Sequence, residues 1–353
     1  MRITRVSYER LDLVLSVPYT IAYETIGESV NFILKVETDT SIVGYGCAAP
    51  DSLVTGENPD EVEQLIRDTV IPFLAGKNPF TYANILERLR ILLEGKSSTL
   101  AMVDIALHDI ISKKTGVPLF EYLGGFRDHI ATSITIGILS PEDTLRQASE
   151  YVGRGFNILK IKGGRDLEAD IEKMILLREK FPDIKLRFDG NQGYTVDDSV
   201  TFFKRTVQVG VEIFEQPTRI DNEEKLGEVT SQVRLPVMAD ESLRNLTDAF
   251  RLAQDQRIDM VNIKLMKVGG ILQAMHINSV AKSAQLEAMV GCIDECGIGI
   301  SAGLHFALSS PNVHYADLDG HLDMPGDPFK SLFRLKNGIL YPSENPGLGM
   351  EHW

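Results

Sequence analysis

Short apolar runs that each end in a polar residue recur through the second half of the chain. The runs are Ile158–Lys162, Leu186–Asp189, Glu212–Glu215, Pro236–Asp240, Met260–Lys264 and Ala288–Asp294. The polar residues that end them are 27, 26, 25, 24 and 30 residues apart. Between the runs, Asp166–Lys180 and Leu246–Asp255 have apolar residues at three- and four-residue spacing, which predicts amphipathic helices. A strand–helix unit of about 25 residues repeated in this way is typical of a parallel (β/α) barrel.

An open, doubly wound sheet is the alternative for alternating strands and helices. Such a sheet normally has a Gly-rich phosphate-binding turn after its first strand. No such turn is present in the sequence, so the barrel is the favoured interpretation.

The first hundred residues follow another pattern and predict a small α+β unit. Val30–Glu37 alternates and is rich in β-branched residues, and Ile42–Gly46 follows a polar turn, so the two segments predict a hairpin. Asn58, followed by Pro59 and three acids, predicts a helix start. A further helix is expected after Pro79 and another over Leu100–Lys114.

Two segments of this unit are predicted to be loops, namely Pro18–Gly27 and Pro50–Gly56. The tail Pro325–Trp353, rich in Gly and Pro, is too short for a domain, and we expect it to fold back on the opening unit. The sequence therefore predicts an α+β capping domain over residues 1–125, a barrel over 126–322 and a returning C-terminal segment over 323–353.

Composition narrows the class of partner. The 353 residues have a formal net charge of −14, which argues against nucleic acid and against an anionic membrane surface. No run of 18 apolar residues and no signal-peptide core is present, and three cysteines suit a reducing compartment. We expect a cytoplasmic enzyme that acts on a small molecule.

Three carboxylates end successive predicted strands: Asp189, Glu215 and Asp240. In a barrel, the C-terminal ends of the strands converge on one mouth, where three carboxylates repel one another unless a cation lies between them. Oxygen ligands without His or Cys favour Mg²⁺ or Mn²⁺. The alternative is that each acid pairs with a local base.

Lysines flank these acids on both sides. Lys160 and Lys162 share one face of the preceding strand, and Lys264 ends the strand that follows. An ammonium group buried beside another cation and a divalent metal has a lowered pKa, which makes it usable as a base. The alternative is a lysine that extends to solvent, which suits Lys267 better than Lys264.

Together these groups predict a reaction. A metal that chelates a substrate carboxylate stabilises the enediolate formed when the neighbouring carbon loses its proton. Bases on both faces of that carbon would remove the proton from one side and return it on the other, so racemisation or epimerisation is expected.

The motifs resemble the muconate-lactonizing branch of the enolase superfamily over nearly the whole chain. They occur in the expected order: Val103–Gly125, KIK at Lys160–Lys162, FDGNQGY at Phe188–Tyr194, FEQP at Phe214–Pro217, ADES at Ala239–Ser242 and NIKLMKVGG at Asn262–Gly270. The resemblance implies a modified TIM (β/α)7β barrel whose α+β cap closes over the mouth and is completed by the tail. It also implies a homo-oligomer and one Mg²⁺ per subunit, for which Mn²⁺ can substitute, bound by Asp189, Glu215 and Asp240. The two acid/base catalysts would be Lys162 and Lys264, with Lys160 touching the substrate carboxylate.

Within this branch, Asp317 and Asp319 are similar to the Asp-x-Asp of dipeptide epimerases, which holds the free ammonium group of the substrate. The resemblance thus implies inversion of the α-carbon of the C-terminal residue of an L,L-dipeptide. Relatives that act on Ala-Glu generally have an apolar residue at the position of Asp294. Acids at this position and in the cap would repel a Glu side chain and attract Lys or Arg, so we expect a preference for cationic dipeptides. The residues expected to contact the substrate are Lys160, Asp294, Glu295, Asp317, Asp319, Asp323, Glu24, Asp51 and Thr135.

Other functions stay open. N-acylamino-acid racemase, o-succinylbenzoate synthase and muconate cycloisomerase belong to the same branch. A barrel that binds metal without catalysis is the alternative from another class.

Overall fold

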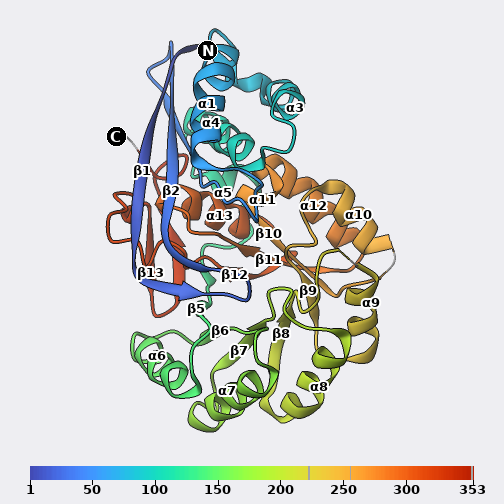
Figure 1. Ribbon diagram of the computed structural model, residues 1–353. Coiled ribbons are helices and arrows are strands. Elements are labelled where there is room, and N and C mark those ends of the chain that lie inside the picture. The colour runs from blue at the N-terminus through green and yellow to red at the C-terminus, as the bar shows by residue number, and fades with distance from the viewer. Residues whose placement is uncertain (222, 255, 351–352) are drawn as a thin grey trace.

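The central element is a closed barrel of parallel strands. The computed structural model describes residues 1–221, 223–254, 256–350 and 353. Its largest sheet has eight strands in the order β12-β11-β10-β9-β8-β7-β6-β5 (Figure 1). A parallel bridge between Thr132 and Ala316 brings the segment before β5 against β12, which closes the sheet. The strands are β5 (Ile134–Ile136), β6 (Ile158–Lys162), β7 (Lys185–Asp189), β8 (Val211–Glu215), β9 (Val237–Ala239), β10 (Met260–Lys264), β11 (Glu287–Gly291) and β12 (Val313–Asp317).

An α-helix follows each strand from β5 to β11, and within the described residues no α-helix follows β12, so the predicted (β/α)7β barrel is confirmed. The helices are α6 (Pro141–Gly153), α7 (Leu167–Lys180), α8 (Val196–Thr206) with the 3₁₀ turn η3 (Val207–Val209), α9 (Glu223–Gln232), α10 (Leu246–Gln254), α12 (Ile271–Ser283) and α13 (Gly297–Ser309); a short α11 (Leu265–Val268) precedes α12. Their starts follow from the sequence, as in α7, where the Asp166 side chain accepts a hydrogen bond from the Ala169 N–H.

Two predicted strands match the structure residue for residue, namely β6 and β10. The prediction that a strand continues to Asp294 is wrong, because β11 ends at Gly291. The chain then forms a tight turn of its own, in which the Glu295 N–H donates to the Ile293 carbonyl at 2.8 Å. Asp294 therefore lies in a loop beyond the end of the strand.

Residues two apart on the strands form layers inside the barrel. Ile213, Met238, Met260 and Met289 pack together as one apolar layer. Two positions further along the chain from the first three are Glu215, Asp240 and Asn262. The twofold period of a strand thus places polar groups on the same interior face, one level nearer the C-terminal ends.

The N-terminal unit combines an antiparallel sheet with helices and has a core of its own around Phe32, Leu34 and Met102. The predicted hairpin is confirmed as β2 and β3, and Asn58 caps α1 as expected. The elements are β1 (Ile3–Thr20), β2 (Thr25–Thr38), β3 (Val43–Ala48), α1 (Pro59–Leu65), the π-helical η1 (Ile66–Val70), α2 (Ile71–Leu74), the 3₁₀ turn η2 (Pro79–Thr81), α3 (Tyr82–Leu92), α4 (Ser97–Thr115) and α5 (Leu119–Tyr122).

The loop predicted over Pro18–Gly27 is shorter in the structure and covers only residues 21–24. β1 and β2 form one long ribbon, in which Thr20 still pairs with Thr25 (Figure 1). Tyr19 and Ile26 at the end of this ribbon pack against the core that includes the barrel. Local composition could not predict these strand ends, since their apolar partners come from another part of the chain.

The C-terminal segment contacts both units. Its η4 (Lys330–Leu332) is followed by β13 (Phe333–Lys336) and β14 (Ile339–Pro342), and β14 pairs with β4 (Ile130–Ala131). Further on, the Leu348 N–H donates to Asp109 of α4 at 2.8 Å. The division at residues 125 and 322 stays a prediction, and residues 351 and 352 of the tail lie outside the described residues.

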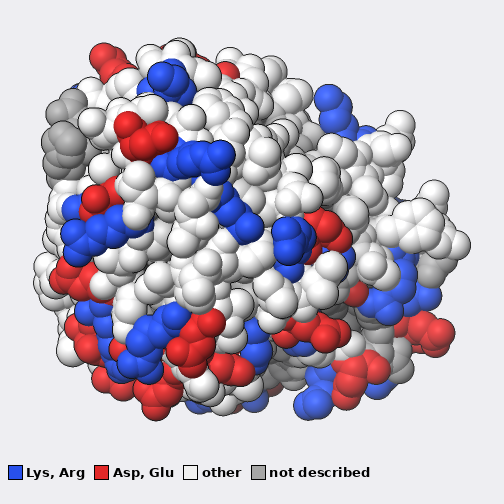
Figure 2. Space-filling model, turned by 90° about the horizontal axis from the view of Figure 1, so that it is seen from above, with Lys and Arg blue, Asp and Glu red and all other residues white. Residues whose placement is uncertain are grey.

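Among the described residues, none of the helices is both long and apolar enough to cross a bilayer. Figure 2 shows lysines and arginines interspersed with acids on the face seen from above, without a continuous basic patch on that face.

Candidate active site

A cavity of about 280 Å³ lies where the ribbon of β1 and β2 meets the barrel mouth. Both units supply its wall. The barrel contributes Lys160, Lys162, Asp240, Lys264, Asp317 and Asp319, and the N-terminal unit contributes Tyr19, Tyr23, Glu24 and Asp51. A concave site with converging charged groups is typical of a small-molecule enzyme.

Strand register brings the predicted carboxylates and lysines to one level. Lys162 of β6 pairs with Asp189 of β7, which in turn pairs with Glu215 of β8. Asp240 directly follows β9, and Lys264 ends β10. The structure thus brings together the proposed metal ligands and catalysts, all of which are at least 92% buried.

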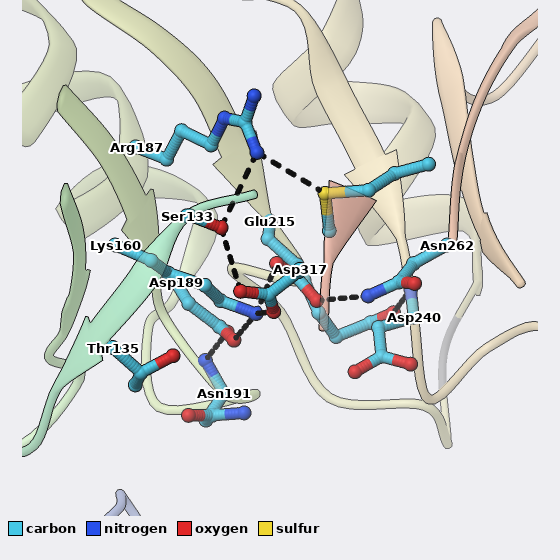
Figure 3. Close-up of polar contacts among 12 residues, drawn as sticks. Ser133, Thr135, Lys160, Arg187, Asp189, Asn191, Glu215, Asp240, Asn262 and Asp317 are labelled. Atoms are coloured by element: carbon cyan, nitrogen blue, oxygen red, sulfur yellow. Dashed lines mark hydrogen bonds and ion pairs between the residues drawn. The ribbon is translucent and has the colours of Figure 1, made fainter. Parts of the chain in front are cut away.

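Lys160 lies at the centre of this group (Figure 3). Its Nζ is 2.7 Å from a Glu215 oxygen, 2.8 Å from Asp317 and 3.1 Å from Asp189. Burial disfavours the charged ammonium, but Asp317, Glu215 and Asp189 outweigh it and raise the pKa of Lys160 well above its usual value. The ammonium group of Lys160 therefore offsets the negative charge of these three carboxylates.

The two proposed catalysts approach the acids from different strands. Lys162 Nζ is 2.7 Å from Asp189, and Lys264 Nζ is 2.8 Å from Asp240. Burial by itself would lower the pKa of Lys264. The nearby carboxylates, Asp240 above all, together outweigh burial, so the pKa of Lys264 is raised overall. The ionised Asp240 carboxylate close to this lysine accounts for the upward direction. The lowering expected beside a divalent metal stays a prediction.

Lys267 has a different place from the one that the sequence suggested. It does not extend to solvent; it is 2% exposed, and its Nζ is 2.6 Å from Asp240 Oδ1. Burial, together with Lys264, lowers its pKa. Asp240 is thus bound by both Lys264 and Lys267. Sequence reasoning missed the contact of Lys267 because the four-residue helix α11 was not predicted.

Gln216 also positions Asp240. Its backbone has φ 31°, an uncommon value for a residue with a side chain, and its Oε1 accepts the N–H groups of Asp240 and Ser242 at 3.0 and 3.1 Å. The residue belongs to the FEQP motif, so its position, though not its role, was visible in the sequence.

The donor set fits a hard divalent cation. At the barrel mouth, three buried acceptors have no hydrogen-bond partner among the described residues: Asn191 Oδ1, Glu241 Oε2 and Asn262 Oδ1. Burial and the nearby Asp189 raise the pKa of Glu215 to about 8, and burial with Asp240 raises that of Glu241 to about 7. A cation would relieve this repulsion, and oxygen atoms alone suit Mg²⁺.

Over residues 1–221, 223–254, 256–350 and 353, no group of three acidic, histidine or cysteine side chains is already arranged to hold a metal. Lys160 contacts both Asp189 and Glu215, and Lys264 contacts Asp240, so ammonium groups occupy the space between the acids.

Asp317 and Asp319 both line the cavity, next to β5. Asp317 accepts from the Ser133 hydroxyl at 2.6 Å, and Asp319 accepts from the Thr135 N–H at 2.6 Å. Burial and the charge of Asp317 raise the pKa of Asp319 to about 7, whereas Lys160 holds that of Asp317 down at about 2 despite its burial. A substrate cation beside Asp319 would find a carboxylate without a lysine partner.

The predicted specificity residues divide into two groups. Glu24, Asp51, Asp294, Asp323 and Thr135 line the cavity, whereas Glu295 is 2% exposed and is not part of the wall. The Oδ2 atom of Asp294 accepts a hydrogen bond from the Tyr19 hydroxyl at 3.0 Å. Sequence reasoning missed Tyr19 because it treated that segment as a loop.

Both parts of the chain match models of one family. The description "Mandelate racemase / muconate lactonizing enzyme, N-terminal domain" matches residues 5–124, and "Enolase C-terminal domain-like" matches residues 143–352. The chain belongs to the mandelate racemase/muconate lactonizing enzyme family. This confirms the predicted resemblance to the enolase superfamily.

Similar members of the family include named epimerases. The chain is 42% identical to the L-Lys-D/L-Arg epimerase of Desulforapulum autotrophicum, with 99% of each chain covered. It is 35% identical to the L-Ala-D/L-Glu epimerase of Bacillus subtilis, with 99% of this chain and 97% of that protein covered. A structure of the Methylococcus capsulatus dipeptide epimerase, complexed with Mg and L-Arg-D-Lys, has a TM-score of 0.96 at 35% identity and 99% coverage of both chains. These matches place the chain in the dipeptide epimerase subgroup and confirm the predicted class, an isomerase acting on amino acid derivatives.

Proposed function

We propose that the protein is a Mg²⁺-dependent dipeptide epimerase that inverts the α-carbon of the C-terminal residue of L,L-dipeptides. The observation that supports this most is the pair of lysines held by two different acids, Lys162 at Asp189 and Lys264 at Asp240. Between them lie the acids proposed to bind the metal, and next to Lys160 lies Asp317. The site thus combines groups that could bind the substrate carboxylate, transfer the α-proton and bind the substrate ammonium group.

The substrate would bind with its carboxylate near Lys160 and its free ammonium between Asp317 and Asp319. Its α-carbon then lies between Lys162 and Lys264. One lysine, in its neutral form, takes the α-proton, and the other gives a proton to the opposite face. Mg²⁺ held by Asp189, Glu215 and Asp240 would supply positive charge beside the substrate carboxylate. We propose one ion per subunit, with Mn²⁺ as a substitute.

Proton exchange tests the activity. The protein is incubated with Mg²⁺ and a panel of L,L-dipeptides in D₂O, and the α-protons are followed by NMR. We expect loss of the α-proton of the C-terminal residue, with formation of the L,D epimer. Exchange only with N-acylated amino acids, and with no dipeptide, would contradict the proposal and favour an acylamino-acid racemase.

The N-succinyl-L-Arg/Lys racemase of Bacillus cereus, 30% identical over 354 residues, makes that comparison necessary. An N-succinyl group ends in a carboxylate where a dipeptide has an ammonium. Asp317 and Asp319 would repel it unless protonated, so we favour the dipeptide.

We further propose that the preferred dipeptides are cationic. Glu24, Asp51 and Asp294 line the part of the wall that contains Tyr19 and Tyr23, and none of these acids forms an ion pair within the described part of the chain. Carboxylates without a counter-ion in the wall of a cavity attract Lys or Arg and repel Glu. The L-Lys-D/L-Arg epimerase at 42% identity supports the same preference. Steady-state rates for Lys-, Arg-, Ala- and Glu-containing dipeptides test it, and the highest kcat/KM with a Glu-containing dipeptide would contradict it.

A further inference from the structure

Asn31 of β2 is an asparagine with no exposed surface, at the contact between the N-terminal unit and the barrel. Its Nδ2 donates to Ser29 Oγ at 3.0 Å and to the Asp294 carbonyl at 3.1 Å. Its Oδ1 accepts the Cys296 N–H at 2.8 Å and the Cys47 thiol at 3.3 Å. Both donors and both acceptor sites of the amide are therefore in use.

Two of these bonds hold the ends of one short segment, Asp294–Cys296. This segment lies between the end of β11 and the start of α13, so neither β11 nor α13 supplies partners for these two backbone groups. Ser29 adds a second bond to the Asp294 carbonyl, at 2.7 Å. The backbone on both sides of Glu295 is thus held from outside the barrel.

The Asp294 side chain is held from the same ribbon, because Tyr19 of β1 donates to its Oδ2. Tyr19, Ser29 and Asn31 come from paired strands, β1 and β2. The ribbon therefore holds both the backbone and the carboxylate of Asp294, although Asp294 belongs to the barrel sequence.

We propose that Asn31 is a positioning residue for Asp294. Through Asn31, recognition of the substrate side chain by Asp294 depends on the contact between the ribbon of β1 and β2 and the barrel. The proposal rests on the proposed function. Loss of the Asn31 amide removes one bond at each end of the segment and leaves Asp294 held by Ser29 and Tyr19 alone. The strand ends, which hold the lysines and the proposed metal ligands, keep their register. Side-chain selectivity is then lost before proton transfer is.

An amide suits this position better than a carboxylate. Asp294 and Glu295 lie in the held segment, and Asp327 accepts the next N–H, that of Gly297, at 2.8 Å. Asn31→Asp keeps the size and the acceptor for Cys296 but removes the donor to Asp294 and adds a negative charge. Asn31→Ala removes both bonds to the segment, namely those to the Asp294 carbonyl and from the Cys296 N–H, and leaves the charge unchanged.

Ser301→Ala is the matched control. The Ser301 hydroxyl is fully buried on α13 and donates to the Leu348 carbonyl at 3.1 Å, so its loss also removes a buried hydrogen bond of the barrel to another segment. It leaves the Asp294–Cys296 segment untouched.

The kinetic test compares a Lys- or Arg-containing dipeptide with L-Ala-L-Ala for each variant. In Asn31→Asp and Asn31→Ala we expect KM for the cationic dipeptide to rise about fivefold to tenfold, the effect of one or two buried hydrogen bonds, with kcat nearly unchanged. KM for L-Ala-L-Ala should stay close to wild type, and Ser301→Ala should leave the selectivity unchanged. Equal losses for both dipeptides in the Asn31 variants would overturn the proposal.

Hydrogen exchange tests the positioning without a substrate. The Cys296 N–H should exchange at least about tenfold faster in Asn31→Ala than in Ser301→Ala, since its acceptor is gone. Unchanged protection of residues 292–297 in both Asn31 variants would overturn the proposal. If the wild-type protein epimerises no dipeptide, the proposed function fails, and this exchange comparison alone decides whether Asn31 positions the segment.

Discussion

The floor and the rim of the cavity are built in different ways. In the floor, Asp189, Glu215 and Asp240 stand at or directly after strand ends, and each is paired with a lysine. In the rim, Glu24 and Asp294 lie in turns and form no ion pair within the described residues, and burial raises the pKa of both. Strand register thus fixes the charges that we assign to proton transfer, while the N-terminal ribbon holds those that we assign to selectivity.

The largest expected effect comes from disturbing the floor through its metal. We expect chelation by EDTA to abolish turnover of every dipeptide and added Mg²⁺ to restore it. Glu215→Gln should lower kcat/KM by about 10³-fold for cationic and neutral dipeptides alike, since charge stabilisation of several kcal/mol is lost. Turnover that survives complete chelation would show that the acids of the floor have another role.

The second largest effect concerns stability. Lys160→Met leaves Glu215, Asp317 and Asp189 without their shared ammonium, and removal of one partner of a buried ion pair costs about 3 kcal/mol or more. We expect denaturant unfolding to show this loss, and Mg²⁺ to restore part of it. Lys282→Met on the exposed side of α12 is the control, and equal stability of the two variants would contradict the assigned role of Lys160.

A pH profile distinguishes the rim from the floor. Burial, helped by the charges of Asp51 and Asp323, raises the pKa of Asp294 to about 6. The hydrogen bond from Tyr19 and the charge of Lys162 act in the opposite direction. Below pH 6 the carboxyl is neutral and above it is charged, so KM for a cationic dipeptide should rise about tenfold as the pH falls from 7 to 5. Protonation of Asp319, whose pKa burial and Asp317 raise to about 7, would weaken binding of the ammonium group of every dipeptide. The effect of Asp294 is therefore read from the ratio of KM for the cationic dipeptide to KM for L-Ala-L-Ala, which should rise as the pH falls.

Asp294→Asn completes that test, because it removes the titrating group without changing its size. We expect it to raise this KM ratio at pH 7 to about the value that wild type has at pH 5, and to flatten the pH profile of the ratio. A ratio that keeps its pH dependence in Asp294→Asn would assign the titration to another group.

The smallest effect is expected for Tyr19→Phe. The lost hydrogen bond stabilises the charged form of Asp294, so the inflection should move to higher pH and KM for cationic dipeptides at pH 7 should rise about twofold to fourfold. Steady-state rates with a cationic and a neutral dipeptide check it, and an equal change for both would count against the contact.

The sequence predicted the floor well because its information is local. Each acid or lysine ends an apolar run, and repeated strand–helix units of similar length place such ends at one mouth; Lys162 and Lys264 therefore lie where they were expected. The rim depends on contacts between segments far apart in the chain. Tyr19 and Asp294 are 275 residues apart, and neither the extension of β1 and β2 nor the early end of β11 has a local cause in the sequence.

The roles of the two lysines are tested most directly by removing them one at a time. Lys162→Ala and Lys264→Ala are incubated with purified L,L and L,D epimers in D₂O, and exchange of the α-proton is followed by NMR. We expect neither variant to interconvert the epimers, and each to exchange the α-proton of one epimer only, with opposite preferences. Exchange of the same epimer by both variants, or epimerisation by either one, would contradict bases on opposite faces of one carbon.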